Sequence, residues 1–385
     1  MTTKLVVEGW RRSSHSYALV NQHQLLQLSR DPRLNVAHVD IPLPKTQWEQ
    51  LDAGFDAAAR QQIDSITTPA SGPDQPSADV IYRISWPMRV HAGDASRVFV
   101  FGTSELQRLQ PRECCGPSGS YADVDREAVE IITPSAWSRV GFVASGFDER
   151  RVHVIPHGVN ARLFRRHSPE EKRRIRLTMQ IPDHCPVFLH IGAMTRYKGI
   201  GPLLAAFALY QQRDERAVLL LKGSDALYGN LMTAALADAA RLLGRSFPQS
   251  SLHSIRYSGD NLSLAGVAQL YGVADVYLAP YRAEGFDLPV LEALASGVVP
   301  IVTAGGATDD FCPDRLSLKV DAVLTSLEDG GRFLEPRLDS IVECMRSAVQ
   351  DEMLRGRVAA EGPPWVGEHY TWSRVGRLLA DRLAA

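Results

Sequence analysis

Short apolar segments alternate with amphipathic ones along most of the chain, which is the pattern of strands that alternate with helices. Residues 17–29 predict an amphipathic helix with leucines on one side, and the Pro-, Ser- and Gly-rich residues 67–78 predict a surface loop. This alternation favours a parallel sheet. Six apolar segments of the first half predict strands, at residues 4–8, 35–41, 78–84, 97–101, 128–132 and 152–160, the last with its turn.

The same pattern begins again near residue 180. Just before it, Ser168, Pro169 and the acidic residues that follow have the sequence of a helix start, with Ser168 as the N-cap. We interpret the basic run at residues 172–176 as a solvated helix face. Strands are then predicted at residues 187–191, 217–221, 254–257, 274–279 and 299–302, and helices at 200–211, 265–271, 288–295 and 372–385.

These patterns divide the chain into two α/β domains and a tail. The first domain is predicted at residues 1–180, the second at residues 181–365, and residues 366–385 contain the last helix. A length of 385 residues favours two domains over one. Two α/β halves of similar size, with ligand-binding loops in the second, imply a cleft between domains.

The composition is that of an ordinary soluble globular protein, with 45% hydrophobic and 22% charged residues. A formal net charge of −2 gives no support for a nucleic-acid binder, and no run of about 18 apolar residues is present to span a membrane. The N-terminus enters a strand pattern without the apolar core of a signal peptide. The five cysteines include no Cys-x-x-Cys pair, so we expect reduced thiols in a cytoplasmic protein.

Candidate chemistry concentrates in residues 280–297, where Glu284 and Glu292 are separated by seven residues. An apolar strand precedes the pair, and the helix that follows ends at Gly297, so the order is strand, loop, helix. The loop therefore lies at the carboxyl end of a strand, where open α/β sheets bind ligands. Its backbone N–H groups beside a helix N-terminus suit an anion such as a pyrophosphate.

Glu292 stands in an apolar run, although isolated glutamates are usually exposed. An unpaired charge in such a run would be costly. Glu292 therefore needs a partner, and a bound ligand is one candidate. One carboxylate of the pair can reach the reacting part of a ligand while the other binds a second part, for instance a diol.

The segment from Glu284 to Ala293 resembles the Glu-x7-Glu signature of retaining family-four glycosyltransferases. That resemblance implies an α/β fold of the GT-B architecture, with two Rossmann-like domains whose parallel sheets face an interdomain cleft. It extends from about Thr133 to the C-terminus, and it includes residues 154–160 and the turn at Lys198 and Gly199. It is weaker before Thr133.

The resemblance implies a nucleotide-sugar in the second domain. Glu292 would then bind the ribose hydroxyls, Glu284 the hydroxyls of the transferred sugar, and Lys198 the diphosphate that leaves. A fixed cation at that position would lower the barrier, because negative charge grows there in the transition state. The family mechanism retains the anomeric configuration and requires no metal or other cofactor, and the last helix often packs back on the first domain. Further candidates for donor binding are Gly192, Gly259, Gly285, Phe286, Asp287 and Leu288.

Two positions of the second domain depart from the family pattern. The family's arginine five positions before the lysine is Ala193 here. The nearby Arg196 either takes over the phosphate contact, as a further catalytic residue, or points outward. Asp287 stands where a glycine is usual, and it either reads a donor hydroxyl or caps the helix.

The first domain departs from the pattern at two further positions. Its first loop has the sequence Ser-Ser-His-Ser at residues 13–16 in place of paired glycines, and Gly102 stands near the usual place of a histidine. His15, His91 and Ser14 are the candidates for this half of the site, with a surface position as the alternative for either histidine.

The sequence therefore predicts a cytoplasmic hexosyltransferase of polysaccharide biosynthesis that uses a nucleotide-sugar donor. The acceptor is a glycan, a lipid-linked sugar or a small molecule, and a lipid-linked acceptor would bring transient membrane contact. The loops at residues 9–16, 86–94 and 112–121 are expected to shape its site. The alternative functions are those of a GT-B sugar phosphorylase, an epimerase, or a non-catalytic sugar-nucleotide-binding subunit.

Overall fold

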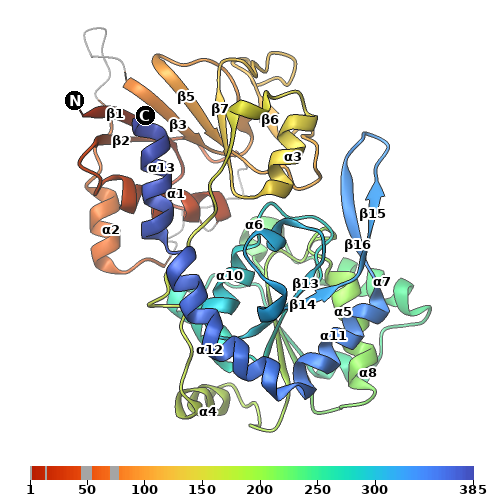
Figure 1. Ribbon diagram of the computed structural model, residues 1–385. Coiled ribbons are helices and arrows are strands. Elements are labelled where there is room, and N and C mark those ends of the chain that lie inside the picture. Colours follow the sequence, from red (N-terminus) through yellow and green to blue (C-terminus); the bar gives the residue numbers. More distant parts are fainter. Residues whose placement is uncertain (1, 14, 45–53, 70–77) are drawn as a thin grey trace. The chain divides into compact units, whose positions relative to one another are not determined.

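The computed structural model describes residues 2–13, 15–44, 54–69 and 78–385 (Figure 1). The chain divides into two compact units, the first of which contains Met1–Gly158 and Trp372–Ala385, and the second Val159–Thr371. Most of the predicted loop at residues 67–78 lies outside the described residues. All five cysteines are free thiols in the structure.

A six-stranded parallel sheet forms the centre of the first unit, with strand order β2-β1-β3-β5-β7-β8. All six strands predicted for the first half are present. They are β1 (Thr3–Gly9), β2 (Leu34–Asp40), β3 (Ala78–Ile84), β5 (Ala95–Phe101), β7 (Glu130–Thr133) and β8 (Val152–Val154). The short strands β4 (Met88–Arg89) and β6 (Cys114–Cys115) pair separately, in parallel.

The helices of the first unit are α1 (Ser16–Leu28), α2 (Ala57–Asp64), α3 (Ala136–Ala144), the 3-10 turn η1 (Glu149–Arg151) and α13 (Trp372–Ala384). The helix predicted at residues 17–29 is present as α1, but its predicted amphipathic character is wrong, because its polar residues 21–24 are buried as well. The reason is that α13 packs against α1 (Figure 1). His23 stacks on Trp372 with ring centroids 4.6 Å apart, and Gln24 Oε1 accepts a hydrogen bond of 2.9 Å from the Tyr82 hydroxyl.

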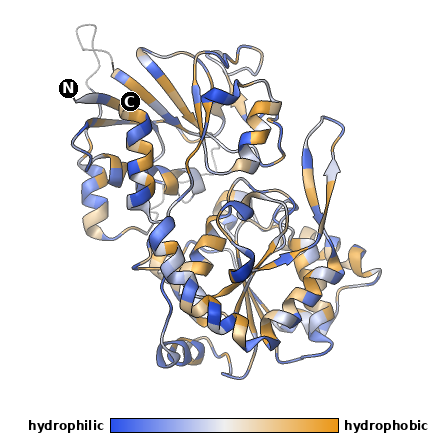
Figure 2. Ribbon diagram, in the orientation of Figure 1, coloured by the Kyte–Doolittle hydropathy of each residue, from blue (hydrophilic) through white to orange (hydrophobic). Residues whose placement is uncertain are grey.

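The second unit has its own six-stranded parallel sheet, with strand order β11-β10-β9-β12-β13-β14. Numbered along this unit, the order is 3-2-1-4-5-6, which is that of the Rossmann fold. Its strands are mostly hydrophobic, whereas helix α4 (Pro169–Thr178) is largely hydrophilic (Figure 2). The strands are β9 (Val187–Ile191), β10 (Val218–Lys222), β11 (Ile255–Ser258), β12 (Val276–Ala279), β13 (Val299–Thr303) and β14 (Leu318–Val320).

Several elements of the second unit were not predicted, among them a hairpin and a long helix. An antiparallel hairpin, β15 (Ala322–Ser326) and β16 (Arg332–Pro336), projects from the rest of this unit (Figure 1). α12 (Glu352–His369) contains Pro363 and Pro364, which obscure its helical pattern. The other helices are α4 (Pro169–Thr178), α5 (Ile200–Gln211), α6 (Asp225–Tyr228), α7 (Met232–Leu243), α8 (Gln249–His253), α9 (Leu264–Val273), α10 (Leu288–Ala295) and α11 (Leu338–Gln350), with 3-10 turns η2 (Ala307–Asp310) and η3 (Asp314–Leu316).

The first unit ends at Gly158 and the second begins at Val159, whereas the predicted domain boundary was near residue 180. The intervening α4 belongs to the second unit, and Ser168 is its N-cap, as predicted, in a capping box with Glu171. Its basic run is not a solvated face throughout. Lys172 Nζ lies 2.7 Å from Asp275 Oδ1, and the buried Arg176 lies 2.8 Å from Asp275 Oδ2.

We expect Asp275→Ala to lower the free energy of unfolding by about 3 kcal/mol, because it leaves two largely buried cations without their counter-ion. The matched control is Asp183→Ala, since Asp183 pairs with Arg173 at 3.7 Å and both side chains are mostly exposed. That change should cost less than about 0.5 kcal/mol. Equal losses in urea denaturation would contradict the structural role of Asp275.

Candidate functional site

The candidate site of the second unit lies where β9 and β12 are neighbours. The strand order reverses direction at this point, and the loops after the two strands lie side by side there. Residues 192–199 connect β9 to α5, and residues 280–287 connect β12 to α10. Ligands of open α/β sheets bind at such a position, outside the carboxyl ends of the strands.

Backbone contacts hold the two loops together. The carbonyl oxygen of Tyr197 accepts hydrogen bonds from the N–H groups of Arg282, at 2.7 Å, and Ala283, at 3.2 Å. Gly199 has a φ of 72°, and a Cβ there would stand 1.9 Å from the carbonyl oxygen of Pro280. A glycine is therefore required both for the backbone conformation and for the close approach of the loops.

This approach brings Lys198 and Glu284 into an ion pair across the junction of the loops. Glu284 is almost completely buried, whereas the Lys198 side chain is a quarter exposed. Apart from this ion pair, no hydrogen bond from the described residues reaches Glu284 Oε1. Such a carboxylate keeps unused acceptor capacity for a ligand. The two residues predicted to act on the donor are thus next to each other.

Arg282 lies in the second loop, residues 280–287, and stabilises it, but the sequence did not reveal this role. Its buried guanidinium donates to both carboxylate oxygens of Glu335 on β16, at 2.6 and 2.7 Å. It also donates to the carbonyl oxygen of Arg196, at 3.2 Å. The charges nearby hold the pKa of Arg282 above its usual value despite its burial. One side chain therefore connects both loops to the hairpin.

Asp287 occupies the N-cap position of α10, but the helix-capping role is wrong, because its side chain makes no capping hydrogen bond. Its φ of 73° explains why glycine is usual at this position. Burial, reinforced by the charge of Glu284, raises the pKa of the Asp287 carboxyl to about 7. The neighbouring Phe286 stacks on Phe311, with ring centroids 4.4 Å apart.

Glu292 lies in α10 and is buried, as its apolar neighbours in the sequence suggested. Its partner within the protein is Tyr271 of α9, whose hydroxyl donates to Oε2 at 2.8 Å. Burial raises the pKa of Glu292 to about 8, and the hydrogen bond from Tyr271 opposes that rise. Near neutral pH the side chain is therefore largely protonated.

The remaining donor-binding candidates lie around the same edge of the sheet. Gly192 follows β9 with a φ of 155°, and Leu288 opens α10. Gly259 follows β11, where a Cβ would stand about 2 Å from the carboxylate of Asp225. The side chain of Arg196 is exposed. No residue set among the described residues has the geometry of a site with three or more His, Cys, Asp or Glu ligands.

His190, in β9, is a second residue of this region that the sequence did not reveal. Its Nδ1 lies 2.7 Å from the carbonyl oxygen of Leu278, which can only accept, so Nδ1 carries the proton and Nε2 is left as an acceptor. Burial lowers the pKa of His190 to about 4. Nε2 is buried and forms no hydrogen bond within the described residues. It lies 3.3 Å from the position that a Cβ on Gly192 would occupy.

The first-unit candidates do not form one cluster. His15 is the N-cap of α1, where its Nδ1 accepts a hydrogen bond of 3.1 Å from the N–H of Tyr17, and it is buried beside Trp10. His91 makes a hydrogen bond of 2.6 Å to the carbonyl oxygen of Ala92. No interaction among the described residues joins the two histidines. Ser14 lies outside the described residues.

Comparisons with known proteins show what this chain is similar to. Residues 185–333 match the family model "Glycosyl transferases group 1". An uncharacterized glycosyltransferase of Methanocaldococcus jannaschii is 28% identical over 78% of this chain and 73% of its own length. A GDP-mannose-dependent phosphatidylinositol monomannoside mannosyltransferase of Corynebacterium glutamicum is 25% identical over 60% of this chain and 55% of its own.

Solved structures of similar fold cover the whole chain. The Anabaena protein HepE, crystallised with UDP and glucose, superimposes with a TM-score of 0.69 at 14% identity, over 100% of both chains. WaaG, a glycosyltransferase of lipopolysaccharide biosynthesis, gives a TM-score of 0.64 at 14% identity, over 99% of both chains. The fold is therefore that of the GT-B glycosyltransferases, and the group 1 glycosyltransferase sequence pattern lies in the second unit.

Glu292→Gln should reduce the pH dependence of stability. Between about pH 5 and pH 8 the folded chain keeps a proton on Glu292 that the unfolded chain releases, so the free energy of unfolding falls as pH rises. The variant has no such titrating group at this position. Its free energy of unfolding relative to that of the wild type should therefore increase by at most about 1.4 kcal/mol per pH unit. Urea denaturation at pH 5.5, 6.5 and 7.5 measures the difference. The exposed Glu343→Gln is the control, and parallel curves for Glu292→Gln and wild type would refute the buried, protonated state.

Proposed function

We propose that this protein is a retaining glycosyltransferase that moves a hexose from a nucleotide-diphosphate sugar to an acceptor. The observation that carries the proposal is the Lys198–Glu284 ion pair at the strand-order reversal of a Rossmann sheet. A cation and a carboxylate with spare acceptor capacity are the two groups that a diphosphate and a sugar require. The match of residues 185–333 to group 1 glycosyltransferases supports the same assignment.

The donor has a natural position along these loops. Its diphosphate would lie at Lys198 and the N-terminus of α5, where the helix dipole favours an anion. Its sugar hydroxyls would donate to Glu284, and the ribose hydroxyls to Glu292. Without ligand, the ion pair satisfies the buried Glu284, and the bound donor would take over as the partner of both charged groups.

The chemistry proposed for the site is electrostatic. As the bond between the sugar and the diphosphate breaks, negative charge grows on the leaving phosphate and positive charge on the sugar ring. Lys198 is positioned to stabilise the negative charge on the leaving phosphate, and Arg196 provides another cation on the same loop. Glu284 is positioned to stabilise the positive charge on the sugar ring. Attack by the acceptor hydroxyl on the same face of the sugar retains the anomeric configuration. We propose that these cations of the protein, with no metal or other cofactor, offset the charge of the leaving group.

Our proposals for the donor sugar and for the biosynthetic role are supported by relatives of this chain. A mannosyltransferase that depends on GDP-mannose and a fold relative crystallised with UDP and glucose both support a hexose donor. The lipopolysaccharide role of WaaG supports a role in polysaccharide biosynthesis. A cytoplasmic location and transient contact with a membrane-borne acceptor are further parts of the proposal. Within the described residues, no helix has both the length and the apolar composition needed to cross a bilayer.

Lys198→Ala should reduce the rate of transfer by roughly 100-fold, the effect of losing one preorganised electrostatic partner of a transition state. Glu284→Gln keeps the shape of the side chain and should likewise cut the turnover number sharply. Single-turnover kinetics with the bound nucleotide-sugar measures both. Lys4→Ala, at an exposed lysine of the first unit, is the control. Full activity of Lys198→Ala would move the leaving-group role to Arg196.

Calorimetric titration with UDP, GDP and ADP in the absence of metal tests the donor site directly. One of the nucleotides should bind, and Glu292→Ala should weaken its affinity by about 10-fold or more, since hydrogen bonds to a charged group are lost. Donation by the ribose hydroxyls favours the ionised carboxylate, so binding near pH 7 should release protons, seen as a buffer-dependent enthalpy. Absence of binding to all three would instead favour a phosphorylase or a non-catalytic subunit.

A further inference from the structure

Two buried acceptor atoms of the candidate site form no hydrogen bond within the described residues, and both lie beside Lys198. One is Glu284 Oε1, which has the Lys198 ammonium as its ion-pair partner. The other is Nε2 of His190, a side chain that is only 2% exposed. Buried polar atoms of folded proteins nearly always have a hydrogen-bond partner, so an acceptor without one needs a physical reason.

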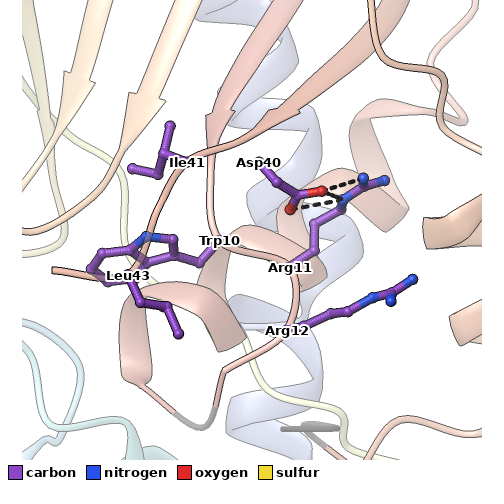
Figure 3. Close-up of a pocket in the computed structure, with 6 residues that line it drawn as sticks. All are labelled: Trp10, Arg11, Arg12, Asp40, Ile41 and Leu43. Atoms are coloured by element: carbon purple, nitrogen blue, oxygen red, sulfur yellow. Dashed lines mark hydrogen bonds and ion pairs between the residues drawn. The ribbon is translucent and has the colours of Figure 1, made fainter. Parts of the chain in front are cut away.

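A cavity of the first unit shows the usual case, in which polar groups are paired. Its volume is about 210 Å³, and it is lined by Trp10, Arg11, Arg12, Asp40, Ile41 and Leu43 (Figure 3). There Arg11 NH2 lies 2.5 Å from Asp40 Oδ2. The indole N–H of Trp10 donates a hydrogen bond of 3.2 Å to the carbonyl oxygen of Pro42. These groups have partners within the protein, whereas Nε2 of His190 has none among the described residues.

The His190 ring is held so that Nε2 stays an acceptor. Nδ1 donates to the carbonyl oxygen of Leu278 at 2.7 Å. The ring stacks on Tyr277, with centroids 6.1 Å apart and an interplanar angle of 16°. Burial lowers the pKa of His190 to about 4, and the charge of Lys198 contributes to that lowering. The imidazole is therefore neutral near pH 7, with its proton on Nδ1 and a lone pair on Nε2.

Nε2 of His190 and the end of the Lys198 side chain border the same small space at Gly192. A Cβ on Gly192 would stand 3.3 Å from Nε2, 3.6 Å from Cε of Lys198 and 3.7 Å from its Cδ. The N–H of Gly192 donates to the carbonyl oxygen of Lys222 at 2.9 Å, which holds the backbone at this place. Because Gly192 has no side chain, nothing of that residue separates the imidazole from the lysine.

Lys198 can supply the hydrogen bond that Nε2 lacks. An ammonium carries three N–H donors on a flexible stem, enough for a diphosphate, for Nε2 and for a third acceptor. In the structure this ammonium is paired with Glu284. A diphosphate at the N-terminus of α5 would attract it by charge, and a hydrogen bond to a neutral acceptor would then fix its direction without adding a further charge.

We propose that His190 is a positioning residue for Lys198: once the diphosphate of the donor is bound, the Lys198 ammonium donates a hydrogen bond to Nε2 and is thereby fixed against the leaving phosphate. A cation held in place before the reaction stabilises the growing negative charge without reorganisation. This inference rests on the proposed function. It adds to that function a residue that acts through Lys198, while the Nδ1 hydrogen bond holds its ring.

Nitrogen NMR of the full chain, labelled with ¹⁵N-histidine, tests this hydrogen bond without relying on turnover. A ring nitrogen that carries a lone pair resonates at lower frequency when it accepts a hydrogen bond. The Nε2 resonance of His190 is assigned among the 11 histidines by its loss in His190→Gln. If that variant does not fold, His→Gln substitutions at the other histidines assign the resonance by elimination. UDP, GDP and ADP are then titrated separately, without metal.

Before nucleotide is added, Nε2 should resonate at the frequency of a nitrogen without a hydrogen bond. The nucleotide that binds should move the resonance to lower frequency in the wild type. Lys198→Ala, saturated with the same nucleotide, should show no such shift. Lys319→Ala is the matched control, because Lys319 is a lysine of the same unit that also pairs with a carboxylate, 2.6 Å from Asp309 Oδ1. It should leave the shift unchanged.

The single-turnover rate with bound nucleotide-sugar should follow the presence of an acceptor at this position. His190→Phe keeps an aromatic ring but lacks both nitrogens. It should lower the rate by about 10-fold or more, the effect of losing a hydrogen bond to a charged group, and change nucleotide affinity less. His190→Gln has an amide that can donate to Leu278 and accept from Lys198, so it should restore most of the rate.

A shift that persists in Lys198→Ala overturns the proposal, because a bound water or the ligand would then be the donor. A hydrogen-bonded frequency before any nucleotide is added also overturns it, as do equal rates in His190→Phe and wild type. If calorimetry shows no binding of the three nucleotides, the proposed function fails and this inference fails with it. Binding of a nucleotide with an unchanged Nε2 resonance overturns the inference alone.

Discussion

The candidate site depends on the close approach of two loops at the junction of β9 and β12. Gly199 allows its backbone to lie against the carbonyl of Pro280, where any Cβ would overlap. Tyr197 then accepts two backbone hydrogen bonds from the second loop, and Lys198 meets Glu284. Because Glu284 is buried, this pairing also supplies the counter-ion without which its charge would be costly. A backbone requirement at one residue thus determines the electrostatics of the site.

The three acidic side chains of this segment are all buried, but they carry different charge states. Glu284 has Lys198 as a counter-ion, whereas burial raises the pKa of Asp287 to about 7 and that of Glu292 to about 8. Lys198 is therefore the counter-ion of Glu284, whereas burial favours the protonated forms of Asp287 and Glu292. Ligand hydroxyls that donate to these groups would favour their ionised forms. A ligand with several hydroxyl groups would therefore lower the pKa values of Asp287 and Glu292.

Residues distant in sequence support this arrangement in each unit. In the second unit, Arg282 links the two loops to the hairpin strand β16 through Glu335, so the hairpin is mechanically connected to the candidate catalytic residues. In the first unit, α13 covers α1, and the stack of His23 on Trp372 joins the two ends of the chain.

The sequence by itself determined the α/β class and nearly every strand of the two large sheets, because apolar runs and turn residues are local signals. It also located Lys198, Glu284 and Glu292, whose spacing is a local pattern. It did not reveal Arg282, His190 or Tyr271, and it misjudged α1, Lys172 and Arg176. These residues owe their roles to distant partners, which lie from 21 positions away, as Glu292 does for Tyr271, to more than 300, as Trp372 does for His23. Only tertiary structure supplies such partners, since burial and charge pairing depend on which distant segments are packed together.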